Sequence, residues 1–325
     1  MLIEEKAWIS DIQRFCIQDG PGIRTTVFFM GCNLSCNWCQ NPETRISGRQ
    51  LMFDKSKCIY CYNCIDVCTE KCINKKPLSI KINRFKCSVC GKCAEICLTK
   101  ALEICGKLYS VKEVFKEVFR DEVFYKKSTG GVTLSGGEPM LRPLFCAELL
   151  KMCRERGINT VMETAGCVSW SAFELILDYV DLFLYDLKTL NNNEHKLKIG
   201  VENTLILENI KKLSNLNKNI IARIPLITGF NDNLKSFRKI LNFIKNNTNI
   251  EIIHLLPFHQ LGSSKYELLG LDYEMQAVKE LDNFGQFIIE GEKKGFKIDV
   301  GGYYYNNFKI NSKKKNIFFI KEILK

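Results

Sequence analysis

Three cysteines have a spacing that suits a metal cluster. Cys32, Cys36 and Cys39 follow the pattern C-x3-C-x2-C, directly after an apolar and β-branched run at residues 25–30. Full ligation of a [4Fe–4S] cluster normally takes four thiolates. A local set of three would leave one iron free to bind a small molecule, and an open position distinguishes catalytic from structural metal sites. The alternatives are a zinc knot and three ordinary buried thiols.

Eight further cysteines form an internal repeat. They read C-x2-C-x2-C-x3-C twice, and each cysteine of the second set lies 29 residues after its counterpart. In bacterial two-cluster ferredoxins the fourth cysteine of each run ligates the other cluster. The pattern therefore predicts two [4Fe–4S] clusters, one held by Cys58, Cys61, Cys64 and Cys97 and the other by Cys87, Cys90, Cys93 and Cys68.

The repeat departs from the ferredoxin pattern in small ways. The proline that usually follows the fourth cysteine is Thr69 in one half and Leu98 in the other, which leaves the turn less fixed but removes no ligand. Cys72 and Cys105 lie off the pattern, and we expect them to act as small buried hydrophobic residues. Zinc is the alternative metal for the eight thiols.

The rest of the chain alternates between strand and helix patterns. We expect strands at residues 3–15, 25–30, 131–134, 160–163, 182–187, 220–227, 250–256 and 296–300. We expect a helix capped by Ser110, one from about residue 203, and others at residues 143–156, 171–179, 234–245 and 273–294. Six main strands separated by helices favour parallel βα units in a barrel or an open α/β sheet.

The cysteine-rich segment interrupts this alternation after the first main strand. We therefore expect two domains: a discontinuous one at residues 1–50 and 106–325, and an insert at residues 51–105. Residues past about 302 are expected to form a mobile tail.

Polar motifs follow several of the expected strands, at the ends where sites form in barrel-like α/β folds. The glycines of Ser135-Gly136-Gly137-Glu138-Pro139 would let the backbone approach a ligand closely. Asp186-Leu187-Lys188 offers a carboxylate and an ammonium group. Arg223 lies inside an apolar strand and must reach a counter-charge or solvent. The alternatives are a plain Gly-Gly turn and a surface salt bridge. We expect His254 in the core and His195 at the surface or in a loop.

Several of these stretches together resemble a known family. Asp19-Gly20-Pro21-Gly22-Ile23-Arg24-Thr25-Thr26, the cysteine loop and Gln40-Asn41-Pro42-Glu43 resemble the radical S-adenosylmethionine (SAM) superfamily. More narrowly, the chain resembles the activating enzymes of glycyl-radical enzymes, in the pyruvate formate-lyase activase-like subgroup with a two-cluster ferredoxin-like insert. The resemblance covers nearly the whole chain. It implies an α/β fold, a partial (β/α)6 barrel with an inserted 2x[4Fe-4S] ferredoxin-like domain.

The resemblance also implies roles for single residues. Cys32, Cys36 and Cys39 would be the catalytic cluster ligands. Contacts with the cofactor are implied for Trp38, Cys39, Gln40, Gly136, Gly137, Glu138, Asp186, Leu187, Lys188, Arg223 and His259. The family often has Asp and Asn where this chain has Glu163 and Ala165, so direct ligand contact at these two positions stays open.

The activity implied by the resemblance is radical generation. Three [4Fe–4S] clusters and SAM would be the cofactors, and reductive cleavage of SAM would yield methionine and a 5′-deoxyadenosyl radical. This radical would take hydrogen from a glycine of a partner glycyl-radical enzyme, whose glycine loop would contact residues 19–24. The electron donor would be a flavodoxin or a ferredoxin-type protein. Three other functions stay open: a radical SAM enzyme acting on a small molecule, a ferredoxin-like electron carrier and a zinc interaction module.

Composition and charge narrow the possible cellular locations and binding partners of the protein. The first six residues lack a signal-peptide pattern, and no apolar run approaches the roughly 20 residues needed to span a bilayer. We therefore expect a soluble cytoplasmic protein, with metal rather than disulfides as the reason for seventeen cysteines. The net charge of +11 is spread along the chain, and its densest run, at residues 313–315, lacks the interleaved aromatic residues of a base-stacking surface. We therefore expect no nucleic-acid or membrane partner, and an acidic protein partner is the alternative use of the charge.

Overall fold

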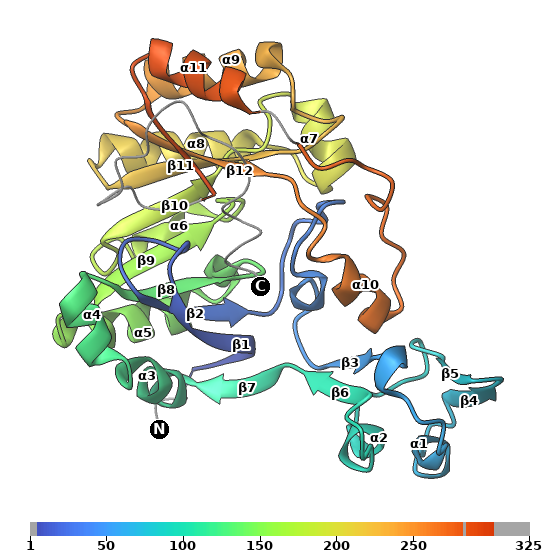
Figure 1. Ribbon diagram of the computed structural model, residues 1–325. Helices are drawn as coiled ribbons and strands as arrows, with labels where there is room; N and C mark the ends of the chain where they lie inside the picture. The colour runs from blue at the N-terminus through green and yellow to red at the C-terminus, as the bar shows by residue number, and fades with distance from the viewer. Residues whose placement is uncertain (1–4, 282–283, 302–325) are drawn as a thin grey trace.

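A computed structural model describes residues 5–281 and 284–301. Its centre is one sheet made of β1 (Lys6–Cys16), β2 (Arg24–Phe29), β7 (Lys107–Ser110), β8 (Gly131–Gly136), β9 (Asn159–Thr164), β10 (Leu182–Asp186), β11 (Ile220–Leu226), β12 (Ile252–Pro257) and β13 (Lys297–Val300). The strand order is β13-β12-β11-β10-β9-β8-β2-β1-β7. β2 and β8 to β13 run parallel, whereas β1 is antiparallel to both β2 and β7 (Figure 1). The fold is therefore an α/β core with a mixed, mostly parallel sheet.

Helices pack on the sheet and, together with its strands, form the main core. These helices are α3 (Val111–Phe119), α4 (Glu122–Ser128), α5 (Pro143–Glu155), α6 (Trp170–Glu174), α8 (Thr204–Asn215), α9 (Leu234–Asn247) and α11 (Gly285–Lys293). Two further helices, α7 (Asn192–Ile199) and α10 (Ser263–Leu269), contribute no residue to this core. Along β11, Ala222 and Ile224 pack into this core, while Arg223 between them points to the opposite, inner face. On the inner face Val161, Leu184 and Ile221 form a separate apolar layer.

The six main strands and the edge strand are confirmed, and the largest error concerns a helix. Residues 273–294 do not form one helix: α11 begins at Gly285, and the described residues 271–281 contain neither helix nor strand. The side chain of Gln260 donates hydrogen bonds to the carbonyls of Gln276 and Val278, at 3.1 and 2.8 Å, which a helix would use internally. The expected helix at 171–179 is shorter, and the expected tail past residue 302 lies outside the described residues.

The cysteine-rich segment forms a small unit beside the sheet (Figure 1). Its first and last strands pair with each other, and a hairpin and three short helices lie between them. The elements are β3 (Gln50–Phe53), the short helix η2 (Lys55–Lys57), α1 (Asn63–Asp66), β4 (Ile73–Lys76), β5 (Ser79–Ile82), α2 (Lys92–Glu95) and β6 (Leu102–Cys105). The segment has an apolar cluster of its own, which includes Leu51, Ile73, Ile80 and Leu102.

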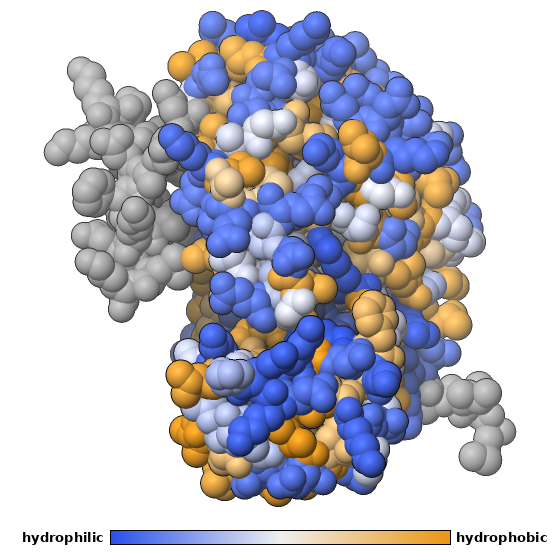
Figure 2. All heavy atoms as spheres, turned by 90° about the vertical axis from the view of Figure 1, so that its right-hand side faces the viewer, coloured by the Kyte–Doolittle hydropathy of each residue, from blue (hydrophilic) through white to orange (hydrophobic). Residues whose placement is uncertain are grey.

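The surface of this segment is mixed. Figure 2 faces the side of the molecule on which the segment lies, and its lower part shows hydrophobic groups among hydrophilic ones. The exposed large hydrophobic residues of the segment are Ile59, Leu78, Phe85, Ile96 and Leu98. No helix among the described residues is long and apolar enough to cross a membrane.

The start of α3 provides a test of a local sequence prediction. Ser110 Oγ accepts from the Glu113 amide at 3.4 Å, and Glu113 Oε2 accepts from the Ser110 amide at 2.8 Å, which completes a capping box. Ser110→Ala should lower the free energy of unfolding by about 1 kcal/mol in urea titrations, because the Glu113 amide loses its hydrogen-bond partner. Ser169→Ala is the matched control, since Ser169 precedes α6 without capping any amide. Equal losses in the two variants would contradict this account.

Candidate active site

The cysteine loop follows the carboxyl end of β2 and is held as a compact turn. The Gly31 amide donates to the Thr44 carbonyl at 2.7 Å and the Cys32 amide to the Arg45 carbonyl at 3.1 Å, so the loop closes on the short helix η1 (Pro42–Thr44). Two apolar side chains anchor it. Leu34 and Trp38 are buried in a cluster with Ile199, Ile227, Phe258 and Met275, and the Trp38 ring lies 4.8 Å from that of Phe230.

The three loop thiols are free and partly exposed. Burial raises the pKa of Cys32 to about 12 and that of Cys36 to about 11, so without metal these thiols stay protonated. A coordinating metal reverses this, because a thiol bound to it is deprotonated outright. Two cations balance the negative charge that would result: Arg45 contacts the Cys36 carbonyl, and Lys188 lies near Cys36.

The second half of the loop is clamped by residues that sequence reasoning missed. The guanidinium of Arg45 donates to the Tyr266 hydroxyl at 3.1 Å, and that hydroxyl donates to the Cys39 carbonyl at 3.1 Å. Gln40 is one of the expected cofactor contacts, and its side chain bridges to the loop after β12. It donates to the His259 carbonyl at 3.0 Å and accepts from the Gly262 amide at 2.9 Å. The clamp thus belongs to α10 and the segment before it.

The Gly-Gly segment after β8 is packed against the cysteine loop. The Gly137 amide donates to the Phe29 carbonyl and the Glu138 amide to the Gly31 carbonyl, both at 2.8 Å. A Cβ atom on Gly136 would lie 2.3 Å from the Phe29 amide nitrogen, and one on Gly137 would lie 2.3 Å from the Gly31 carbonyl oxygen. The close backbone approach expected from these glycines is therefore an approach to the chain itself.

Glu138 lies beneath this junction and is 2% exposed. Its carboxylate accepts from the Met140 amide at 3.1 Å, the Thr164 hydroxyl at 2.8 Å and the Ala165 amide at 2.9 Å. Burial raises its pKa to about 7, although these three donors favour the ionised form. The side chain therefore ties the end of β8 to the end of β9.

A layer of charged side chains lies at the carboxyl ends of β9, β10 and β11. Arg223 Nη1 is 2.7 Å from Glu163 Oε2, and Lys188 Nζ is 2.7 Å from Asp186 Oδ2. Asp186 Oδ1 lies 3.6 Å from Arg223 Nε, too far for a hydrogen bond. Neither of these two atoms has another hydrogen-bond partner among the described residues, although both are buried. Glu163 therefore contacts Arg223 directly. Asp186 Oδ1 and Arg223 Nε remain as polar atoms that a ligand could use.

Electrostatics hold this layer in its charged form. Burial alone would lower the pKa of Lys188, but the Asp186 carboxylate raises it. The carboxylates of Glu163 and Asp186 likewise raise the pKa of Arg223 against the effect of its burial. Both side chains therefore stay cationic at any physiological pH.

The remaining expected site residues lie in different surroundings. The Leu187 side chain is buried in the main core. Burial lowers the pKa of His259, which follows β12 beside the cysteine loop. His254 is a core residue as expected, 1% exposed. The expectation for His195 is wrong: it is buried on α7, where Nδ1 lies 2.6 Å from the Val201 carbonyl oxygen.

Two cavities in the cysteine-rich segment match the two predicted ligand sets. One is lined by all four cysteines of the first set, Cys58, Cys61, Cys64 and Cys97. The other is lined by Cys68, Cys87, Cys90 and Cys93, together with Cys72. Among the described residues no three His, Cys, Asp or Glu side chains are grouped closely enough for a single metal ion.

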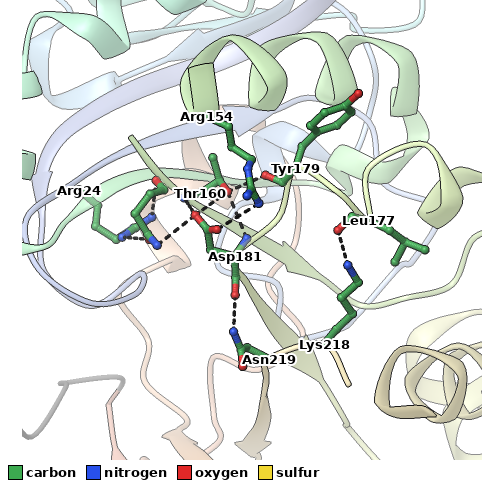
Figure 3. Close-up of polar contacts among 9 residues, drawn as sticks. Arg24, Arg154, Thr160, Leu177, Tyr179, Asp181, Lys218 and Asn219 are labelled. Carbon is green, nitrogen blue, oxygen red and sulfur yellow. Dashed lines mark hydrogen bonds and ion pairs between the residues drawn. The ribbon is translucent and has the colours of Figure 1, made fainter. Parts of the chain in front are cut away.

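A larger cavity, of about 800 Å³, lies at the opposite, amino ends of β9 to β12. Figure 3 shows the polar contacts beside it. Asp181 accepts from Arg154 at 3.3 Å and from the Thr160 amide at 2.9 Å, and Lys218 donates to the Leu177 carbonyl at 2.7 Å. Arg24 is fully buried nearby and donates to the Val132 carbonyl at 2.6 Å. The apolar layer of Val161, Leu184 and Ile221 lies between this end and the charged layer.

Comparison with known proteins shows to which superfamily the chain belongs. A family model described as the radical SAM superfamily matches residues 26–244. The chain therefore belongs to the radical SAM superfamily, which implies a [4Fe–4S] cluster and SAM as cofactors.

Proteins of similar sequence show to which group within the superfamily the chain belongs. Over 269 residues the chain is 43% identical to the trans-4-hydroxy-L-proline dehydratase activating enzyme of Clostridioides difficile, covering 82% of this chain and 89% of that protein. It is 41% identical over 284 residues to the 4-hydroxyphenylacetate decarboxylase activating enzyme of C. difficile strain CD196, covering 84% and 89%. Within the superfamily it is a glycyl-radical enzyme activating enzyme, which uses SAM to generate a radical for a partner enzyme.

One solved structure shows the same fold. Streptococcus suis SuiB bound to the precursor peptide SuiA is 14% identical, with a TM-score of 0.50, and the match covers 83% of this chain and 46% of that one. At this identity the likeness concerns the fold alone. Membership of the activating enzymes decides against a stand-alone electron carrier and a zinc interaction module.

The raised pKa of Glu138 predicts that the stability of the protein depends on pH. Its folded-state pKa of about 7 lies above the ordinary 4.5, so between these values the folded protein keeps a proton that the unfolded chain has released. Stability of the metal-free protein should therefore fall as pH rises from about 4.5 to 7, by up to about 3 kcal/mol. Urea unfolding at several pH values should show this slope in the wild type and lose it in Glu138→Gln. The exposed Glu148, changed to Gln, is the control; parallel pH curves for wild type and Glu138→Gln would refute the assignment.

Proposed function

We propose that Cys32, Cys36 and Cys39 hold the catalytic [4Fe–4S] cluster and that SAM binds between it and the charged layer. The observation that carries this proposal is the juxtaposition of three thiols with a buried charged layer whose Asp186 Oδ1 and Arg223 Nε lack hydrogen-bond partners among the described residues. When bound, the cluster and SAM supply the electron and the 5′-deoxyadenosyl radical. The donor set fits such a group, because soft thiolates are the ligands that iron–sulfur clusters take.

The chain's own part in the reaction is to bind, orient and exclude water. Lys188 and Arg223 are the cations of the charged layer, and either offsets the carboxylate of an amino acid. Asp186 supplies an acceptor for hydroxyl or ammonium groups. Trp38, Phe230 and Phe258 cover the loop with apolar surface, which keeps water from the reacting groups. Glu138 keeps the ends of β8 and β9 in register as a positioning residue.

The partner's glycine loop needs a route to this site, and residues 19–24 are our candidate contact. Asp19 Oδ2 accepts from the Thr26 hydroxyl at 2.7 Å, so the segment folds back along β2. Arg24 is fully buried, and its guanidinium is held by Thr133 and Pro21. The partly exposed residues 21–23 are therefore the part of this segment that would meet the partner.

We propose that residues 51–105 form a ferredoxin-like domain with two further [4Fe–4S] clusters, which gives three in all. The two cavities support this assignment, since each is lined by one predicted set of four thiols. The segment carries ten Lys and Arg residues against five Asp and Glu residues. This excess suits an acidic electron donor such as a flavodoxin or a ferredoxin-type protein. Clusters bound by thiolates need reduced cysteines, so we place the protein in the cytoplasm.

Metal analysis and SAM cleavage test the cluster assignment. Fully loaded protein should contain about twelve irons per chain, from three four-iron clusters. Cys36→Ala should lose about four of them and abolish anaerobic formation of 5′-deoxyadenosine. Cys167→Ala is the matched control, because Cys167 packs against the same apolar cluster but lies outside the motif. Undiminished SAM cleavage by Cys36→Ala would overturn the proposal.

A substitution at Arg223 tests whether the charged layer contributes to SAM cleavage. Arg223→Lys replaces a planar fork by a point charge that cannot serve Glu163 and Asp186 together. Losing a charged hydrogen bond costs about 1.5–3 kcal/mol, so SAM cleavage should slow by roughly 10–100-fold. Arg238→Lys is the control, since Arg238 pairs with Glu290 between α9 and α11. An unchanged rate in Arg223→Lys at full iron content would show that the layer does not act on SAM.

A further inference from the structure

Cys72 lies off both cysteine motifs, yet the fold places it in the second cavity. It directly precedes β4 and is 2% exposed. The same cavity is lined by the second predicted ligand set, Cys68, Cys87, Cys90 and Cys93. The Cys72 carbonyl accepts from the Asn83 amide at 2.7 Å, which fixes the backbone at this point. Cys72 therefore faces the proposed cluster as a fifth thiol.

Two donors of Cys72 lie close to the sulfur of Cys68, a ligand of that set. The Cys72 Sγ atom lies 3.4 Å from Cys68 Sγ, and the Cys72 amide nitrogen lies 3.4 Å from the same sulfur. Between two free thiols either sulfur can be the donor. Once Cys68 binds iron it is a thiolate without a proton, so only the Cys72 thiol can donate.

The other half of the repeat provides an internal comparison. At the position 29 residues later stands Ala101, which is 3% exposed and has no donor in its side chain. There the fourth ligand, Cys97, accepts from the Leu102 amide at 3.4 Å, and the Thr99 hydroxyl is 3.9 Å from its sulfur. An alanine is therefore tolerated at this place in the fold, and the short contact between two sulfur atoms is a property of the Cys68 side.

We propose that Cys72 is a positioning residue whose thiol hydrogen-bonds to the Cys68 thiolate and raises the reduction potential of the cluster held by Cys68, Cys87, Cys90 and Cys93. This inference rests on the two auxiliary clusters of the proposed function. Hydrogen bonds to cluster sulfurs are among the factors that set these potentials, because they stabilise the more negative, reduced form. The thiol thus makes the two auxiliary clusters electronically different although their ligand spacings are identical.

The test uses the full chain with Cys32, Cys36 and Cys39 all changed to Ala, so that only the auxiliary clusters remain. This background should contain about eight irons. An electron-spin-resonance redox titration should give two midpoint potentials. Adding Cys72→Ala should shift one of them to a lower value and leave the other in place. Cys72→Ser keeps a donor and should restore most of the shift, whereas Cys105→Ala, an off-pattern cysteine that lines neither cavity, should change nothing.

Each contrary result has a distinct meaning. Eight irons with both potentials unmoved in Cys72→Ala would overturn the hydrogen bond to Cys68. Loss of four irons in Cys72→Ala would show that Cys72 is a ligand, and this too would overturn the proposal. A background without iron would refute the auxiliary clusters and this inference with them, while leaving the result for Cys36→Ala intact.

Discussion

The site depends on the junction where β8 joins the start of the cysteine loop. Two backbone hydrogen bonds connect Gly137 to Phe29 and Glu138 to Gly31, and only glycines fit so close to the facing backbone. The buried carboxylate of Glu138 then fastens the end of β9 to the same point. Three parallel strands are thereby fixed relative to one loop. The loop that carries the thiols is thus as firmly placed as the sheet itself, which a site needs if its ligands are to be preorganised.

The inner face of the sheet separates two environments by simple alternation. Charged side chains at the carboxyl ends lie above an apolar layer, and a polar network closes the amino ends below it. The apolar layer separates the lower cavity from the charged layer, whose side chains are largely buried and therefore interact in a medium of lower dielectric constant than water. The cavity of about 800 Å³ therefore lies at the other end of the sheet from the cysteine loop, and residue chemistry rather than volume points to the candidate site.

Much of the fold could be predicted because its strands are apolar runs punctuated by glycine and cap residues. The helix expected at 273–294 could not be judged correctly from its pattern, because Met275 and Val278 have helical spacing but pack with the apolar side chains of the cysteine loop. His195 was misplaced because its neighbours Asn193 and Glu194 are polar, while its ring is buried by a contact with Val201. The thiols were evident from spacing. The partners of Glu138 and Gln40 were not, since they lie 26 and 222 residues away in the sequence.

Helix α10 touches both the cysteine-rich segment and the cysteine loop, and this couples the two. Arg84 donates to the carbonyls of Leu51 and Leu268, while Tyr266 and Lys265 hold Cys39 and Glu43. The paired strands β3 and β6 bring the two ends of the segment together. The segment and the cysteine loop therefore share one helix. Excising the segment would uncover one side of that helix and loosen its hold on the loop.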